Sequence, residues 1–252
     1  MAAWYWRSST AVLAALAIAT LIVTFPLFKR LRIIDSSGPL RCDIAVLKAG
    51  MGYGIRAYLL AALGFLVLRV NSIILENFVS AAELGTWSVA AQIIETLTMI
   101  PATMALLLFP KLLKSATPIE MLKESLRNAA ALMLILAAMT AYLGPMLISI
   151  MFGERFFEAY HMVLWGLPGA VALGLISILS QYLAAERFPS PLILIWISAV
   201  AVETASSLYL IPALGGRGAM MAMSISYLFL LISISFLVLA TAKRREPIKP
   251  IL

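Results

Sequence analysis

The sequence predicts an all-α integral membrane protein. Of its 252 residues, 63% are hydrophobic and only 12% are charged, whereas soluble domains average about 25% charged residues. Apolar stretches of about 20 residues, long enough to cross a bilayer as helices, recur along the chain. The single cysteine, Cys42, and the single histidine, His161, exclude an internal disulfide and a multi-cysteine or histidine-cluster metal site. No cofactor is expected.

Seven stretches are long and apolar enough to be membrane-spanning helices. They are residues 9–28, 52–75, 85–109, 128–151, 160–184, 190–211 and 218–241. The first has neither a positively charged start nor a clear cleavage site, so we expect a retained span and not a signal peptide. The connections are short. In the longest, 29–51, the segment DIAVLKAG is a candidate interfacial helix.

The positive charges predict the orientation of these spans. Arg7, Arg155 and Arg217 lie on one side, Arg69 lies within a span, and the other 15 of the 19 lysine and arginine residues lie on the opposite side. Those 15 are Lys29, Arg30, Arg32, Arg41, Lys48, Arg56, Lys111, Lys114, Lys123, Arg127, Arg187, Lys243, Arg244, Arg245 and Lys249. Because short loops rich in lysine and arginine remain cytoplasmic, the N-terminus is expected outside and the C-terminus inside.

The same distribution argues against a nucleic-acid partner. The net charge of +7 comes from residues spread over loops, with no single basic patch interleaved with exposed aromatics. Membrane lipids are the expected surroundings of these loops.

Three ionisable residues are predicted to lie within the outer half of the membrane. At a rise of about 1.5 Å per residue, Arg69 lies about 9 Å, Glu203 about 12 Å and Glu95 about 15 Å from the outer ends of their helices. A charge at the centre of a membrane helix costs about 2.5–3.5 kcal/mol on insertion scales. Such groups therefore face a cavity or each other. For Arg69, a cavity-facing role, an ion pair with Glu95 and a side chain extended to the interface all stay open.

Two of the predicted spans carry further residues that indicate a polar face, a bend or close helix packing. Gln92, Glu95 and Thr96 share one helix face, and Pro101 follows on the same helix as a candidate hinge, although a static kink accounts for it equally. The segment GLPGAVALG (166–174) favours close helix packing.

Three segments resemble the C-terminal half of polysaccharide flippases, which are exporters of O-antigen and other lipid-linked oligosaccharides in the multidrug/oligosaccharidyl-lipid/polysaccharide superfamily. The first is residues 47–112, with an R-x-D-like sequence at Arg69, then LGTWSVA as a loop, E-x-L-x-x-x-P and a closing FP. The second is FGERFFEAYHMVLWGLPG (152–169), an extracytoplasmic link, and the third is the turn LYLIPALGGRGAMMAM (208–223). Two positions depart from the family pattern: Asn71 stands where aspartate is frequent, and Glu203 stands where asparagine or an apolar residue is expected.

The resemblance implies one six-helix lobe of a two-lobe transporter that works by alternating access. Residues 1–28 would be the last helix of the N-terminal lobe, 29–51 a cytoplasmic linker, 52–241 the C-terminal lobe and 242–252 a basic cytoplasmic tail. The implied substrate is a polyprenyl-diphosphate-linked oligosaccharide, moved across a bacterial inner membrane during polysaccharide biosynthesis, including that of lipopolysaccharide.

The resemblance also gives roles to individual residues. Arg69, Asn71 and Gln92 are candidates for substrate binding, and Glu95 and Glu203 for coupling to H⁺ or Na⁺. Arginine suits a diphosphate because its planar fork pairs with phosphate oxygens and keeps its charge.

Other functions remain open at this level. The chain could be a non-transporting remnant, or a half-subunit that needs an N-terminal lobe or a partner chain. A drug exporter of related fold would favour an acidic cavity over an arginine. A membrane enzyme would need a larger extracytoplasmic loop, so no enzymatic activity is expected.

Overall fold

The computed structural model describes residue 14 and residues 17–26, 44–115 and 117–244. The chain divides into two units, Met1–Lys48 and Ala49–Leu252, and each is described by itself. In the first unit the described backbone includes the short apolar helix Ala17–Pro26. Both ends of the span expected at 9–28, most of the linker and the end of the basic tail lie outside the described residues.

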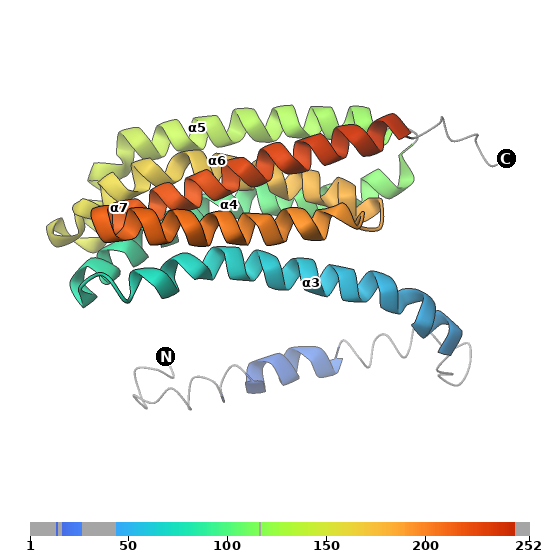
Figure 1. The fold of residues 1–252 in the computed structure, drawn as a ribbon, viewed down its shortest axis with the longest axis horizontal. Helices are drawn as coiled ribbons and strands as arrows, with labels where there is room; N and C mark the ends of the chain where they lie inside the picture. Colours follow the sequence, from blue (N-terminus) through green and yellow to red (C-terminus); the bar gives the residue numbers. More distant parts are fainter. Residues whose placement is uncertain (1–13, 15–16, 27–43, 116, 245–252) are drawn as a thin grey trace. The chain divides into compact units, whose positions relative to one another are not determined.

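Five helices in the described part of the chain are long and apolar enough to cross a membrane. The elements are α3 (Ile44–Leu75), α4 (Ala81–Lys114), α5 (Pro118–Phe152), the short 3₁₀ helix η1 (Glu154–Phe156), α6 (Glu158–Ala185) and α7 (Pro191–Arg244) (Figure 1). The all-helical membrane class predicted from the sequence is therefore confirmed.

The longest helix, α7, is a hairpin that contains two of the predicted spans. It has 54 residues and a single non-helical residue, Gly215 (φ 55°, ψ −133°), at which the chain reverses (Figure 1). We call residues 191–214 the first arm and residues 216–244 the second arm. The hydroxyl of Ser226 on the second arm donates to the carbonyl of Ala199 on the first (3.0 Å), which holds the two arms together.

Several boundaries differ from the sequence prediction: for example, α5 begins at Pro118 and not at residue 128, and α4 continues to Lys114 beyond residue 109. The backbone of DIAVLKAG continues into α3 as one helix from Ile44, so it is not a separate interfacial helix, and α3 begins inside the expected linker. The LGTWSVA segment forms early turns of α4 and not a loop. This helix begins at Ala81 because Ser80 caps it, its hydroxyl accepting a hydrogen bond from the Glu83 backbone N–H (3.3 Å).

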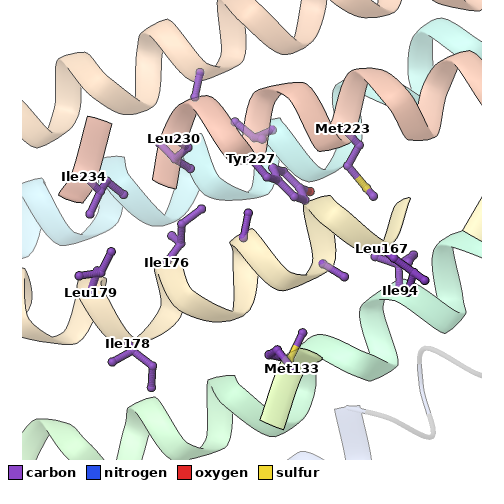
Figure 2. Packing of buried hydrophobic residues seen from close by; sticks show 14 of the residues in the cluster. Ile94, Met133, Leu167, Ile176, Ile178, Leu179, Met223, Tyr227, Leu230 and Ile234 are labelled. Carbon is purple, nitrogen blue, oxygen red and sulfur yellow. The ribbon is translucent and has the colours of Figure 1, made fainter. Parts of the chain in front are cut away.

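Helix α6 is the centre of the bundle. It packs against α4, α5 and α7 and has buried residues on all sides, as expected for a helix that is apolar all round. Figure 2 shows Ile176 and Leu179 of α6 among side chains from α7, with Met133 of α5 nearby.

Small residues on α6 let its neighbours approach closely. A Cβ built at Gly166 would lie 3.1 Å from the Ile94 side chain of α4, and one at Gly174 would lie 3.0 Å from both Pro101 and Met133. Close packing of small residues replaces the hydrophobic driving force that is absent between helices in lipid. The packing interpretation of this glycine-rich segment is confirmed.

A serine of α7 is inserted into the hydrogen-bond ladder of α6. The hydroxyl of Ser224 accepts from the Gly169 N–H (3.1 Å) and donates to the Trp165 carbonyl (2.6 Å), a pair that would otherwise bond directly within the helix. Pro168 lies beside this point and lacks an N–H of its own. The inserted hydroxyl satisfies both backbone groups in a region without water.

The hairpin turn of α7 is held by α4. The Gly216 N–H, at the start of the second arm, donates to Oε1 of Glu83 (2.8 Å), an acidic partner at a helix N-terminus. A Cβ at Gly215 would collide with the same carboxylate. Arg217 adds an ion pair from α7 to Glu158 of α6 (2.7 Å).

Gly169→Ala should destabilise the bundle by about 1–3 kcal/mol, because the added methyl overpacks a rigid contact. Its Cβ would meet the backbone Cα of Ser224 at 2.9 Å. The matched control is Gly85→Ala on α4, where nothing lies within 4 Å and alanine favours the helix by about 0.8–1.0 kcal/mol. Denaturant unfolding of both variants in detergent micelles measures the difference. Equal stability of the two variants would contradict the close contact.

Candidate functional site

A cavity of about 350 Å³ lies beside α3 and α4. Its lining residues are Val67, Leu68, Arg69 and Asn71 of α3, Trp87, Ser88, Ala91, Gln92, Ile94, Glu95 and Thr98 of α4, Leu173 of α6, and Met223 and Tyr227 of α7. The cavity therefore brings together four of the residues singled out from the sequence: Arg69, Asn71, Gln92 and Glu95.

Arg69 is exposed at this cavity and rests on an aromatic ring. Its guanidinium carbon lies 5.6 Å from the centroid of the Phe65 ring, one helical turn earlier on α3, a cation–π arrangement. No ion pair joins Arg69 to Glu95, although both line the same cavity. The cation and its hydrogen-bond donors are thus directed to an open space and not to an internal carboxylate.

The polar face of α4, which we call its open face, is also exposed. Ser88, Gln92, Glu95 and Thr96 are exposed, and the hydroxyl of Thr96 donates to the Gln92 carbonyl (2.7 Å). The Gln92 amide and Glu95 carboxylate remain directed away from the bundle core. Together with Arg69, this face offers a cation, an amide and a carboxylate within one concave site.

Asn71 has a different environment from the other three. It is 2% exposed, its Nδ2 donates to the Ala219 carbonyl (2.8 Å), and its Oδ1 accepts from the Ser207 hydroxyl (3.2 Å). Ser207 is on the first arm of α7 and Ala219 on the second. The Asn71 amide therefore joins α3 to both arms, and the hydrogen bonds it makes are structural.

Glu203 is not among the residues that line the cavity. It is fully buried, with 0% of its surface exposed, on the first arm of α7. The Ser226 hydroxyl lies beside its carboxyl group, but that hydroxyl donates to the Ala199 carbonyl. Neither carboxyl oxygen of Glu203 has a hydrogen-bond partner of ordinary geometry among the described residues.

Sequence reasoning missed Tyr227. This residue is 1% exposed, lines the cavity, and is within electrostatic range of both Glu203 and Glu95. It lies between Met223 and Leu230 on the second arm (Figure 2). The spacing of these three residues is typical of an apolar helix face, so no sequence signal distinguished the phenol from core packing.

Pro101, the candidate hinge, is buried inside a continuous α4. It packs against Gly174 of α6, where the missing Cβ leaves room for the proline ring. The structure thus shows the packing of this residue, and hinge motion stays a prediction.

A second, mostly apolar groove of about 420 Å³ lies between α4, α5 and α6. Gln92 lines both this groove and the polar cavity, so the two are neighbours on either side of the open face of α4. Among the described residues, no group of three or more histidine, cysteine or acidic side chains gathers as a metal site.

Comparisons with known proteins add no assignment. No protein-family description matches the chain, and no curated protein matches it.

Asn71→Ala should destabilise the protein by about 1–3 kcal/mol, since it removes two interhelical hydrogen bonds and leaves buried partners unsatisfied. The control is Asn77→Ala, because the Asn77 amide bonds the Ile73 carbonyl at the exposed end of α3 and its loss should change stability by less than about 0.5 kcal/mol. Denaturant unfolding of both variants measures the effect. A stable Asn71→Ala protein that loses ligand binding would show instead that Asn71 contacts the ligand.

Proposed function

We propose that this chain is one lobe of a membrane transporter that moves a polyprenyl-diphosphate-linked oligosaccharide by alternating access. The observation that carries the proposal is the open cavity at which Arg69, Gln92 and Glu95 meet in the middle of an otherwise apolar bundle. Ionisable side chains at membrane depth mark substrate or ion pathways, because their exposure to lipid is costly.

Arg69 supplies the chemistry for a diphosphate. Its five N–H donors are fixed in a planar fork that matches two phosphate oxygens at once, and no internal carboxylate neutralises it. The amide of Gln92 adds donors on the facing helix. The cavity volume of about 350 Å³ suits a head group, so the glycan would extend beyond the described lobe.

The open face also supports a second lobe. When the lobe is taken by itself, four polar side chains are exposed: Arg69, Ser88, Gln92 and Glu95. The hydrocarbon of a bilayer offers them no hydrogen-bond partner. A facing lobe, supplied by further sequence or by a partner chain, would enclose them in a shared water-filled cavity. Transmembrane helices associate after insertion, through packing, so either source is compatible with this arrangement.

The proposed orientation follows from the charges at the two ends of the bundle. Lys111 and Lys114 end α4, Lys123 and Arg127 lie in the first turns of α5, and Arg187 follows α6. With these ends in the cytoplasm, the N-terminus is outside and seven spans cross a bacterial inner membrane. Arg69 then lies toward the outer leaflet, where a flipped lipid would be released.

Arg69→Ala should weaken binding of a polyprenyl diphosphate by about tenfold or more, since a hydrogen bond to a charged group contributes about 1.5–3 kcal/mol. Arg69→Lys should retain part of the affinity, because a point charge remains without the fork. Equilibrium binding to the chain in lipid nanodiscs measures this, and export of the glycan in a strain that lacks the transporter tests the consequence.

The matched control is Arg155→Ala. Arg155 also rests on a phenylalanine ring, with its guanidinium carbon 4.8 Å from the Phe156 centroid, but it lies outside the cavity in η1. Its loss should leave binding unchanged. Equal affinities of wild type and Arg69→Ala, or an equal loss in Arg155→Ala, would overturn the substrate assignment. Binding of hydrophobic cations in place of the diphosphate would favour a drug exporter.

A further inference from the structure

A further groove, of about 370 Å³, lies between α5, α6 and the second arm of α7. We call it the Arg127 groove, because Arg127 of α5 is the charged residue that lines it. Apart from Ser235 of α7, its other lining residues are apolar: Leu126 and Ala130 of α5, Leu175 and Leu179 of α6, and Leu231 of α7. None of them comes from α3 or α4, so this groove is separate from the cavity at Arg69.

Arg127 is the last charged residue before the membrane-crossing part of α5. Residues 118–127 include four charged side chains, whereas residues 128–152 include none. A helix that changes from charged to apolar in this way passes from the head-group region of a bilayer into the hydrocarbon. Arg127 is therefore at the depth of the lipid phosphates, and Ala130 continues the groove one turn further into the hydrocarbon. In the orientation proposed above, this is the cytoplasmic leaflet.

The guanidinium of Arg127 has no internal counter-charge. Its side chain is exposed, and among the described residues no ion pair joins it to an acidic side chain. Lys123 lies one turn earlier, and positions 123, 126, 127 and 130 share one helix face because their spacing is i, i+3, i+4 and i+7. Glu124 falls outside this spacing, and Glu120 lies about two turns from Arg127. The groove face of α5 thus carries two cations at its head-group end.

The surface around the groove is apolar and exposed. On α5, Leu134 is 61% exposed, and on the second arm of α7, Ile232 is 57% and Phe236 is 69% exposed. Exposed apolar surface of this kind marks contact with a membrane or with another protein. The second lobe proposed above would cover the open face of α4, which contributes no residue to this groove. The neighbour that this surface fits is therefore lipid.

We propose that the Arg127 groove is a binding site for an anionic phospholipid, with the phosphodiester on Arg127 and one acyl chain against the leucines of the groove. The planar fork of an arginine pairs with two phosphate oxygens at once, and basic pockets between membrane helices bind anionic head groups. A zwitterionic lipid fits less well, because its own cation is repelled by Lys123 and Arg127. The site does not depend on the proposed transport function.

The test is native mass spectrometry of the full chain released from detergent micelles, with phosphatidylglycerol or phosphatidylcholine of identical acyl chains added. One phosphatidylglycerol per chain should stay bound at lipid concentrations at which phosphatidylcholine has dissociated. Arg127→Ala should weaken this binding by about tenfold or more, because hydrogen bonds to a charged phosphate are lost. Arg127→Lys should retain part of the affinity, since the charge remains without the fork.

Matched variants separate this site from general attraction to lipid. Arg56→Ala removes an exposed arginine of α3 that is expected on the same side of the membrane but does not line the groove, so binding should be unchanged. Ala130→Phe fills the groove beside Arg127 and should weaken binding of phosphatidylglycerol although the charge stays. Ala131→Phe places the same ring at an exposed position of α5 outside the groove and should leave binding unchanged.

The other outcomes decide between this site and its alternatives. Equal affinities for the two lipids, an equal loss in Arg127→Ala and Arg56→Ala, or an unchanged affinity in Ala130→Phe would overturn the lipid site. A dimer that Ala130→Phe dissociates would assign the groove to a second copy of the chain and overturn it as well. Binding that follows the expectations in a protein that does not bind the polyprenyl diphosphate would retain the lipid site and reject only the transport function.

Discussion

The hydrocarbon core of a membrane offers no hydrogen-bond partner, and this constraint explains the hydrogen bonds that the buried polar groups of the bundle make with one another. Asn71 satisfies it by joining α3 to both arms of α7, and Ser224 satisfies it by bridging Trp165 and Gly169 within α6. In both cases a buried polar side chain replaces partners that water would supply in a soluble protein. These bonds add to the buried apolar core and to the close contacts at the glycines of α6.

Among the ionisable and amide side chains singled out from the sequence, those without a hydrogen bond of ordinary geometry or an ion pair to another described side chain have two environments. Arg69, Gln92 and Glu95 face a cavity, and Glu203 is enclosed within the protein. The first set is suited to an anionic ligand, and Tyr227 lines the same cavity. A transporter needs a site for its substrate, and the polar lining of this cavity supports the proposed function.

Some of this could be predicted from the sequence and some could not. Apolar length predicted where the five described membrane helices lie, because bilayer thickness sets span length, but α3 and α5 begin at Ile44 and Pro118, well before the expected residues 52 and 128. The association of Arg69, Gln92 and Glu95 followed from the cost of burying charge in lipid. The role of Asn71 was not accessible, since its partners lie 136 and 148 residues away along the chain. Tyr227 was hidden because its spacing is that of a core residue, and the sharp reversal at Gly215 depends on a carboxylate from α4.

The proposed function requires that the open face of α4 lines a water-filled cavity and does not contact lipid. Cysteines placed at Ser88 and Gln92, in a chain whose own Cys42 is replaced by serine, can be tested with a membrane-impermeant maleimide, which reacts with the thiolate formed in water. The control is a cysteine in place of Tyr142, which is 85% exposed on α5 at a comparable distance from the outer end of its helix. Rapid labelling is expected at positions 88 and 92 and none at position 142. Equal protection of all three positions would show that this face contacts lipid and would contradict the cavity.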